Sequence, residues 1–195
     1  MDRVTLSNPM AIILVGLPGS GKSFFANQFA SNLEAPIVSE DKIRWTLFAH
    51  HTYSDSENTV VKQVASMIIT ELLKTKQTFI LDGGYDNRVL REKLIAQVKK
   101  AGFKVVTIVV QTDPSTAQQR SKGRNSNRVG DRYKQALSES DFTNLAKKYQ
   151  APLQGDKTAV VISGRHTYPS QARIVLKKIF EIQSLNQHTA HPGRL

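Results

Sequence analysis

The stretch AIILVGLPGSGKS, residues 11–23, decides the fold of this chain. Its first part, Ala11 to Val15, is a continuous apolar run that ends at a glycine, as is typical of a buried strand in a parallel sheet. The rest has the spacing G-x-x-x-x-G-K-S. After it, Phe25, Phe29 and Leu33 recur every four residues, which predicts a helix that begins at Lys22. A strand, this loop and a helix in that order define a P-loop, or Walker A motif.

The loop carries the residue types that hold the phosphates of a nucleotide. Its glycines let successive N–H groups converge on phosphate oxygens, and the N-terminus of the helix adds a partial positive charge. Lys22 is expected to reach the outer phosphates of ATP, and the Ser23 hydroxyl is expected to bind Mg²⁺, which prefers oxygen ligands. The nucleotide-binding residues expected in this stretch are Gly16, Leu17, Pro18, Gly19, Ser20, Gly21, Lys22, Ser23 and Phe24.

Outward from the loop, strand patterns alternate with helical ones. The other strands are expected at residues 36–39, 78–82, 104–110 and 158–163, and the other helices at 41–48, 54–72, 88–101, from 114 onward and at 169–185. This alternation predicts an α/β fold, a P-loop NTPase three-layer sandwich whose five-stranded parallel sheet has helices on both faces. One domain is expected over residues 1–187, with a mobile lid at 118–132, and residues 188–195 are expected to fray as a flexible tail.

Charge and composition narrow the class of partner. The chain has 27 Lys and Arg residues against 16 Asp and Glu, a formal net charge of +11, and the segment from Gln118 to Lys178 supplies 13 − 4 = +9 of it. Such a surface favours anionic partners: a nucleotide fits, and a nucleic acid is a further candidate beside a merely solubilising role. There is no cysteine, no secretory signal and no apolar run near the roughly 20 residues of a membrane span, so a cytoplasmic location without a membrane is expected.

The remaining motifs narrow the reaction. No [NT]-K-x-D guanine-reading motif is present, and the strand TFILD ends in Asp82 followed by two glycines, without a glutamate to polarise water. A kinase needs no such glutamate, because its acceptor is a substrate hydroxyl. Asp82 is expected to orient Mg²⁺ through water; a plain turn at a strand end is the structural alternative. The histidines have no spacing with carboxylates that suggests zinc.

Asp41 and Arg44 follow the second strand at a spacing that puts them on one helix face. Asp41 could accept the proton of the acceptor hydroxyl, and Arg44 could hold an anionic group of the acceptor; a local ion pair at a helix N-terminus is the structural alternative. Trp45, Phe48 and Tyr85 could stack on a base or could simply be packed. On periodicity alone, Arg91 would be a surface charge on its helix.

Arg120, Arg124 and Arg128 recur every four residues, so that in a helical lid they would line one face. Arginine suits bidentate contact with phosphate, and closure of such a lid would place positive charge on the transferring phosphoryl group. A solvated basic helix is the alternative.

Together these residues resemble the polynucleotide-kinase-like branch of P-loop kinases, a group related to zeta toxins and often labelled as an AAA-type ATPase domain. GLPGSGKS matches its G-x-P-G-S-G-K-[ST], SEDKIR its D-x-x-R, ILDGGYDNRVLR its third strand, and QQRSKGRNSNR its arginine lid. The chain departs from the family where Asp82-Gly83-Gly84-Tyr85 replaces Asp-x-Thr-Asn. The resemblance implies that Asp41 is the general base, that Arg44 contacts acceptor phosphate, and that the lid arginines Arg120, Arg124 and Arg128 contact ATP. With the P-loop lysine, the expected catalytic residues are Lys22, Asp41, Arg124 and Arg128. The acceptor-binding residues that it implies are Asp41, Arg44, Asp82 and Arg91.

The expected function is therefore Mg²⁺- and ATP-dependent phosphoryl transfer to a free hydroxyl. The 5′-hydroxyl of a nucleic acid or nucleotide is one candidate acceptor. The alternatives are a small-molecule kinase of the zeta-toxin or antibiotic-phosphorylating type, and a nucleotide-binding switch with slow ATPase activity. The sequence does not define an oligomeric state.

Overall fold

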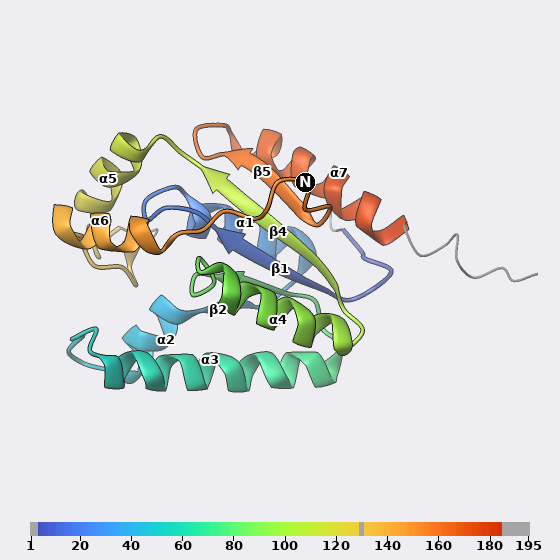
Figure 1. The fold of residues 1–195 in the computed structure, drawn as a ribbon, viewed down its shortest axis with the longest axis horizontal. Helices are drawn as coiled ribbons and strands as arrows, with labels where there is room; N and C mark the ends of the chain where they lie inside the picture. Colours follow the sequence, from blue (N-terminus) through green and yellow to red (C-terminus); the bar gives the residue numbers. More distant parts are fainter. Residues whose placement is uncertain (1–3, 129–130, 185–195) are drawn as a thin grey trace, which may run out of the picture.

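A computed structural model describes residues 4–128 and 131–184, and its centre is a sheet of parallel strands (Figure 1). The five strands of the sheet lie in the order β2-β3-β1-β4-β5. Their bounds are Met10–Val15 (β1), Ile37–Ser39 (β2), Phe79–Asp82 (β3), Lys104–Gln111 (β4) and Ala159–Ser163 (β5). The predicted strands and the predicted parallel sheet are confirmed. The tail predicted at residues 188–195 lies outside the described residues.

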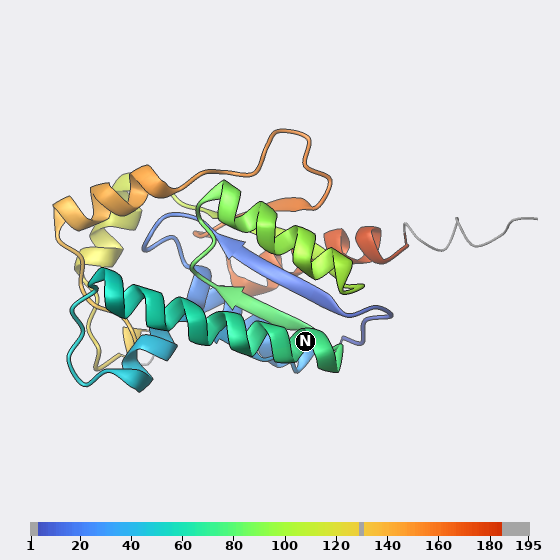
Figure 2. The same ribbon diagram turned by 60° about the horizontal axis from the view of Figure 1, so that its bottom comes forward.

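The central strand explains why the sequence signal was a continuous apolar run. All six residues of β1 are buried, because both faces of the sheet are covered. Met10, Ile12 and Leu14 pack into a core cluster with α1 (Lys22–Leu33) and α7 (Tyr168–Ser184). The alternate residues of β1 pack into a second cluster with α3 (Asp55–Thr75) and α4 (Arg88–Lys100). Figure 2 shows α3 and α4 side by side over this second face. The three layers predicted from the sequence are thus present.

Helix caps set most of the remaining boundaries. The Ser39 side chain caps α2 (Glu40–Leu47), Ser54 caps α3, Asn87 caps α4 and Asp113 caps α5 (Pro114–Lys122). A further helix, α6 (Glu139–Lys148), begins after the cap Ser138 and was not predicted. The predicted helical lid is wrong beyond Lys122: α5 ends there, so Arg124 and Arg128 lie in a loop and do not continue the helical face of Arg120.

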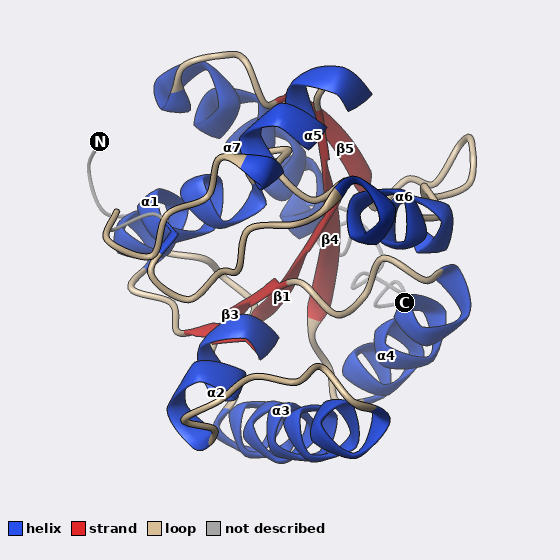
Figure 3. Ribbon diagram, turned by 90° about the vertical axis from the view of Figure 1, so that its left-hand side faces the viewer, coloured by secondary structure: helices blue, strands red, loops and turns tan. Residues whose placement is uncertain are grey.

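One end of the sheet gathers the segments that matter for chemistry. Parallel strands have their carboxyl ends at the same edge, and ligands of open α/β sheets bind there. The strand arrows of Figure 1 point toward α2, α5 and α6, and Figure 3 looks onto this end, with α2, α3, α4, α5 and α6 around the strand ends. No helix of the described part of the chain is long and apolar enough to cross a membrane.

Candidate phosphoryl-transfer site

The P-loop begins directly after β1 and depends on glycine at two close approaches. Gly16 has φ 146° and Gly19 has φ 78°, a region that side chains avoid. A Cβ atom at Gly16 would lie 2.5 Å from the Val110 carbonyl oxygen, and one at Gly19 would lie 2.1 Å from the Ala117 carbonyl oxygen. The loop therefore packs backbone to backbone against the end of β4 and against α5. Phe24, the last of the expected loop residues, is 61% exposed and points away from the core.

Lys22 folds back onto its own loop. Its ammonium donates hydrogen bonds to the Gly16 carbonyl and, at 3.0 Å, to the Leu17 carbonyl. Burial lowers the pKa of Lys22, and the charges of Asp86 and Asp82 oppose that shift. The ammonium is thus held by two backbone carbonyls of its own loop, from which it can turn toward a phosphate oxygen.

Asp86 is a site residue that the sequence analysis missed. Its Oδ1 atom accepts a hydrogen bond of 2.9 Å from the Gly16 amide, the first N–H of the loop. The signal for it was an aspartate four residues beyond a strand that ends beside the P-loop, which is too common a pattern to single out. Asp86 therefore joins the β3–α4 loop to the nucleotide-binding loop.

The residues expected to hold Mg²⁺ fit a cation. Residue pairing places Asp82 opposite Leu14, at the end of β3 beside the strand that enters the P-loop, and Asp82 is 9% exposed. The Ser23 hydroxyl accepts a hydrogen bond from the Lys134 ammonium, so a positive charge already lies where the metal is expected. Among residues 4–128 and 131–184, no cluster of three or more His, Cys, Asp or Glu side chains could hold a metal. Such a site suits an ion bound mainly by nucleotide phosphates and water.

Asp41 lies in the first turn of α2 and faces the same space. Burial raises the pKa of Asp41, and the positive charge of Lys134 is the largest influence that opposes the shift. Asp82 raises the pKa further, whereas Arg124 and Lys22 lower it. The predicted base thus lies among the P-loop lysine, the lid arginine Arg124 and the carboxylate at the end of β3.

Arg44 is buried in an ion pair within the protein. Its Nη1 atom lies 2.5 Å from the Glu57 carboxylate and its Nη2 atom donates to Asn58 Oδ1 at 2.8 Å, while the guanidinium lies 4.4 Å from the centre of the Tyr53 ring. Although burial alone would raise it, hydrogen bonds from Thr52 and Arg44 lower the pKa of Glu57 to about 2. The local ion pair considered as an alternative is therefore present, and it joins α2 to α3. A contact between Arg44 and the acceptor stays a prediction.

Arg91 is not a surface charge: its side chain is buried, with the residue 2% exposed. It donates hydrogen bonds to the Tyr85 carbonyl at 2.8 Å, the Asp86 carbonyl at 3.3 Å and the Gln150 carbonyl at 2.8 Å. The expectation from periodicity was wrong because these acceptors come from a neighbouring loop and from a residue far along the chain. Arg91 fixes the backbone that presents Asp86.

The three lid arginines point to different places. Arg120, on α5, donates to the Gly164 carbonyl at 3.2 Å. Arg124 donates from Nη1 to the Gln135 carbonyl at 3.1 Å, burial lowers its pKa, and Asp41 is the largest influence that opposes this shift. Arg128 is exposed. Arg124 is thus the one of the three placed near Asp41.

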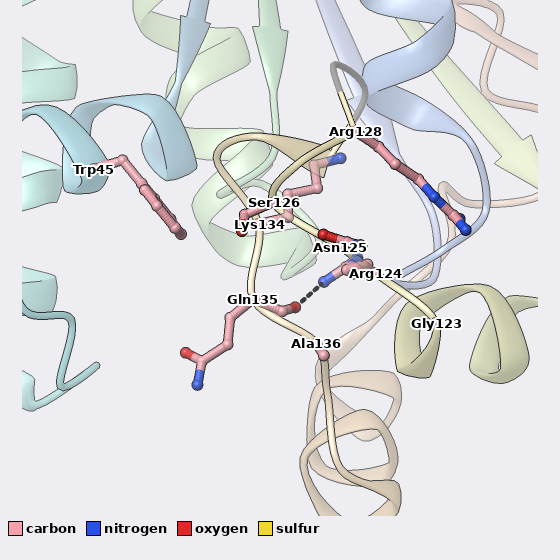
Figure 4. A pocket seen from close by; sticks show the side chains of 9 residues that line it. All are labelled: Trp45, Gly123, Arg124, Asn125, Ser126, Arg128, Lys134, Gln135 and Ala136. Atoms are coloured by element: carbon pink, nitrogen blue, oxygen red, sulfur yellow. Dashed lines mark hydrogen bonds between the residues drawn. The ribbon is translucent and has the colours of Figure 1, made fainter.

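A cavity of about 480 Å³ lies between α2 and the loop that follows α5 (Figure 4). In Figure 4 the Trp45 ring extends from α2 on one side, while Arg128 lies on the other side and points away from it. Trp45 lies one helical turn after Asp41, so the cavity is next to the predicted base. Its lining residues are Trp45, Gly123, Arg124, Asn125, Ser126, Arg128, Lys134, Gln135 and Ala136. They include three cations, one aromatic ring and no carboxylate.

The chain belongs to the family described as AAA domain, whose sequence profile matches residues 12–152. This span contains the P-loop, Asp41, Arg44, Asp82 and the lid arginines. No curated protein matches the sequence at a significant level.

Solved structures show the same fold at low sequence identity. A gluconokinase from Sinorhizobium meliloti 1021 matches with a TM-score of 0.64 and 16% identity over 94% of this chain and 98% of its own. The Mycobacterium tuberculosis APS kinase CysC, in complex with AMPPNP and APS, matches with a TM-score of 0.62 and 17% identity over 89% and 98%. A chain of the Pnkp1/Rnl/Hen1 RNA repair complex matches with a TM-score of 0.61 and 20% identity over 74% of this chain and 45% of its own. The chain thus has the fold of small P-loop kinases.

Proposed function

We propose that this protein transfers the γ-phosphoryl group of ATP to a hydroxyl group of an acceptor, with Asp41 as general base. The observation that carries the proposal is the placement of Asp41, a partly buried carboxylate in the first turn of α2 whose charge interacts with those of Lys134 and Lys22. A switch that only binds and slowly hydrolyses ATP has no need of a base aimed at an acceptor. The fold, shared with small kinases that act on chemically different acceptors, supports the reaction class without selecting the acceptor.

The roles follow from where the side chains lie. The P-loop amides and Lys22 bind the phosphates. Ser23 and, through water, Asp82 would hold Mg²⁺, which would supply charge neutralisation for the phosphates. Asp41 accepts the acceptor proton while the acceptor oxygen forms its bond to the γ-phosphorus atom. The bond from that phosphorus atom to the β–γ bridging oxygen breaks, and ADP leaves. Arg124 places positive charge beside this transfer, and Arg120 contacts the nucleotide.

For the acceptor, we propose the 5′-hydroxyl of a nucleic acid or nucleotide. The cavity next to Asp41 offers an aromatic ring for stacking and the cations of Arg124 and Lys134 for phosphate, without a carboxylate that would repel an anion. In this proposal Arg44, Asp82 and Arg91 support the acceptor side; Arg91 does so through the loop that it holds. The charge of +9 between Gln118 and Lys178 would extend the contact along a nucleic-acid backbone.

A panel of acceptors tests both parts of the proposal. The protein is incubated with γ-labelled ATP and with 5′-hydroxyl DNA, 5′-hydroxyl RNA, nucleosides, sugars, nucleotide sugars and antibiotics, and label transfer is measured. Lys22→Ala is the inactive control, because its loss removes the charge that compensates the outer phosphates. With an oligonucleotide acceptor, log affinity should fall with log salt at about −0.7 per phosphate contacted on a single strand.

The cavity also supports a second candidate, a small-molecule kinase. A volume of about 480 Å³ lies within the range of roughly 300–1,000 Å³ of small-molecule sites. If transfer occurs only to small acceptors, and acceptor affinity does not depend on salt, the protein is a small-molecule kinase and not a polynucleotide kinase. ATP turnover without any phosphorylated product would instead favour the nucleotide-binding switch.

A further inference from the structure

Lys134 is the side chain that joins the donor and acceptor sides of the site, and no sequence pattern singled it out. It lies between the lid loop and α6, and its ammonium donates a hydrogen bond to the Ser23 hydroxyl, 111 residues away in the chain. The segment around it is fixed by three contacts. The Lys134 amide donates to the Asp131 carbonyl at 2.8 Å, Arg124 donates to the Gln135 carbonyl at 3.1 Å, and the Leu137 amide donates to the Ser121 carbonyl at 3.2 Å.

The Lys134 ammonium acts on two charged groups of the site. Among the neighbouring charges, it opposes the rise of the Asp41 pKa most strongly. It also helps to lower the pKa of Lys22, although burial and two opposing carboxylates influence that pKa more. The hydrogen bond to Ser23 places the ammonium at the P-loop, and its charge acts on both Asp41 and Lys22. Lys134 also lines the cavity that holds Trp45. Lys134 therefore contacts the P-loop at Ser23 and also lines the cavity next to α2.

We propose that Lys134 is a catalytic residue that shares the Ser23 hydroxyl with Mg²⁺ and, when metal and nucleotide bind, turns to the transferring phosphoryl group. This inference rests on the proposed phosphotransferase function and adds a residue and an order of events to it. In the transfer, the acceptor oxygen gains the phosphoryl group, Asp41 gains the acceptor proton, and ADP keeps the electrons of the broken bond. The ammonium donates hydrogen bonds to the phosphoryl oxygens and neither gains nor loses a proton.

The shared position has a thermodynamic consequence. A hydroxyl oxygen that binds an ammonium is not free to bind a metal ion, so the two cations compete. The apparent metal affinity falls in proportion to the fraction of molecules in which Ser23 is free. Removal of the ammonium should therefore tighten metal binding, even though it removes a group that assists turnover. A lysine with a purely structural role would not couple these two effects.

The first test measures metal binding without turnover. Mn²⁺ is titrated into the full chain in the presence of ADP, and free Mn²⁺ is followed by electron paramagnetic resonance. Lys134→Met should bind Mn²⁺ more tightly than the wild type, by about tenfold if the ammonium occupies Ser23 nine-tenths of the time. Lys122→Met, which removes an exposed lysine at the end of α5, is the matched control and should match the wild type.

The second test measures turnover with an acceptor that the wild type phosphorylates. Lys134→Met should lower kcat by about 10²–10³-fold, the usual loss when one group that stabilises the transition state is removed, with little change in KM for ATP. Lys134→Arg keeps a cation and should recover part of kcat. Thermal unfolding of each variant checks that the fold is kept.

Either of two results overturns the proposal: a Mn²⁺ affinity of Lys134→Met equal to that of the wild type, or a wild-type kcat. The metal measurement needs no acceptor, so its outcome is independent of which acceptor is found. A wild type that phosphorylates no acceptor would reject the proposed function instead, and the Mn²⁺ titration would still decide whether Lys134 and the metal share Ser23.

Discussion

The Asp86 carboxylate accepts a hydrogen bond from the Gly16 amide across 70 residues of sequence, at 2.9 Å. This contact ties the loop after β3, where we propose that the acceptor side of the site lies, to the first residue of the nucleotide-binding loop. Arg91 donates a hydrogen bond of 3.3 Å to the backbone carbonyl of Asp86. The two halves of the site are therefore positioned by one short segment.

Asp86→Ala should destabilise the protein, because it leaves the partly buried Gly16 amide without its acceptor. We expect a loss of about 1–3 kcal/mol in the free energy of unfolding, the usual penalty for an unsatisfied buried donor. Asp86→Asn is the matched control, since its Oδ1 atom can still accept the hydrogen bond. Urea unfolding monitored by circular dichroism measures both variants; equal losses for alanine and asparagine would show that the hydrogen bond does not matter.

Asp41→Asn should lower turnover by about 10²-fold or more while ATP affinity barely changes, because the amide keeps the shape and removes the base. Burial raises the pKa of Asp41 above its ordinary value of 3.8, and a base works only when it is deprotonated. The wild-type rate should therefore be low at pH values below this raised pKa and should rise as the pH increases through it. The pH dependence of kcat/KM measures this limb, which should be missing from the residual activity of Asp41→Asn.

Glu57 should make the stability of the fold depend on acid. Its folded-state pKa of about 2 lies below the ordinary value of 4.5, so its contribution is complete above about pH 4.5 and is lost as the pH falls toward 2. Glu57→Gln should be less stable than the wild type near neutral pH and should lack this part of the acid dependence. Urea unfolding across that pH range compares it with Glu71→Gln, an exposed glutamate of the same helix. Parallel wild-type and Glu57→Gln curves would contradict the linkage.

Arg124→Ala and Arg128→Ala should lower turnover and leave the fold intact. Arg124 is expected to have the larger effect, about 10²–10³-fold, because it lies beside Asp41, whereas Arg128 is exposed. Arg132→Ala is the control, because Arg132 is an exposed arginine of the same segment. Initial rates with an active acceptor provide the comparison. Wild-type turnover in both variants would mean that these arginines form only a solvated surface.

The sequence was sufficient to predict the features that depend on residues close together in the chain. The strands appeared as apolar runs because both faces of the sheet are covered, and the P-loop appeared because its glycines are required at fixed positions. Helix α6 has a single buried residue, Phe142, and its ten residues are mostly polar, so no extended apolar pattern marked it in the sequence. Asp86, Arg91 and Lys134 were missed or misjudged because their partners lie 70, 59 and 111 residues away. The prediction that the lid arginines share one helical face was wrong because a spacing of four residues puts side chains on one face only within a helix, and α5 ends at Lys122.

The residue Gln150 is fixed to the β3–α4 region through both of its backbone groups: its amide donates to the Asp86 carbonyl at 2.9 Å, and its carbonyl accepts from Arg91 at 2.8 Å. The stretch between α5 and Gln150 is therefore attached at its two ends, close to the P-loop and close to Asp86. Lys134, inside this stretch, also donates to the Ser23 hydroxyl, so the stretch is held beside the P-loop at an internal point as well. We therefore expect a segment grafted from another small kinase to lie in the same place on the nucleotide-binding core only if it keeps a hydrogen-bond donor at this position.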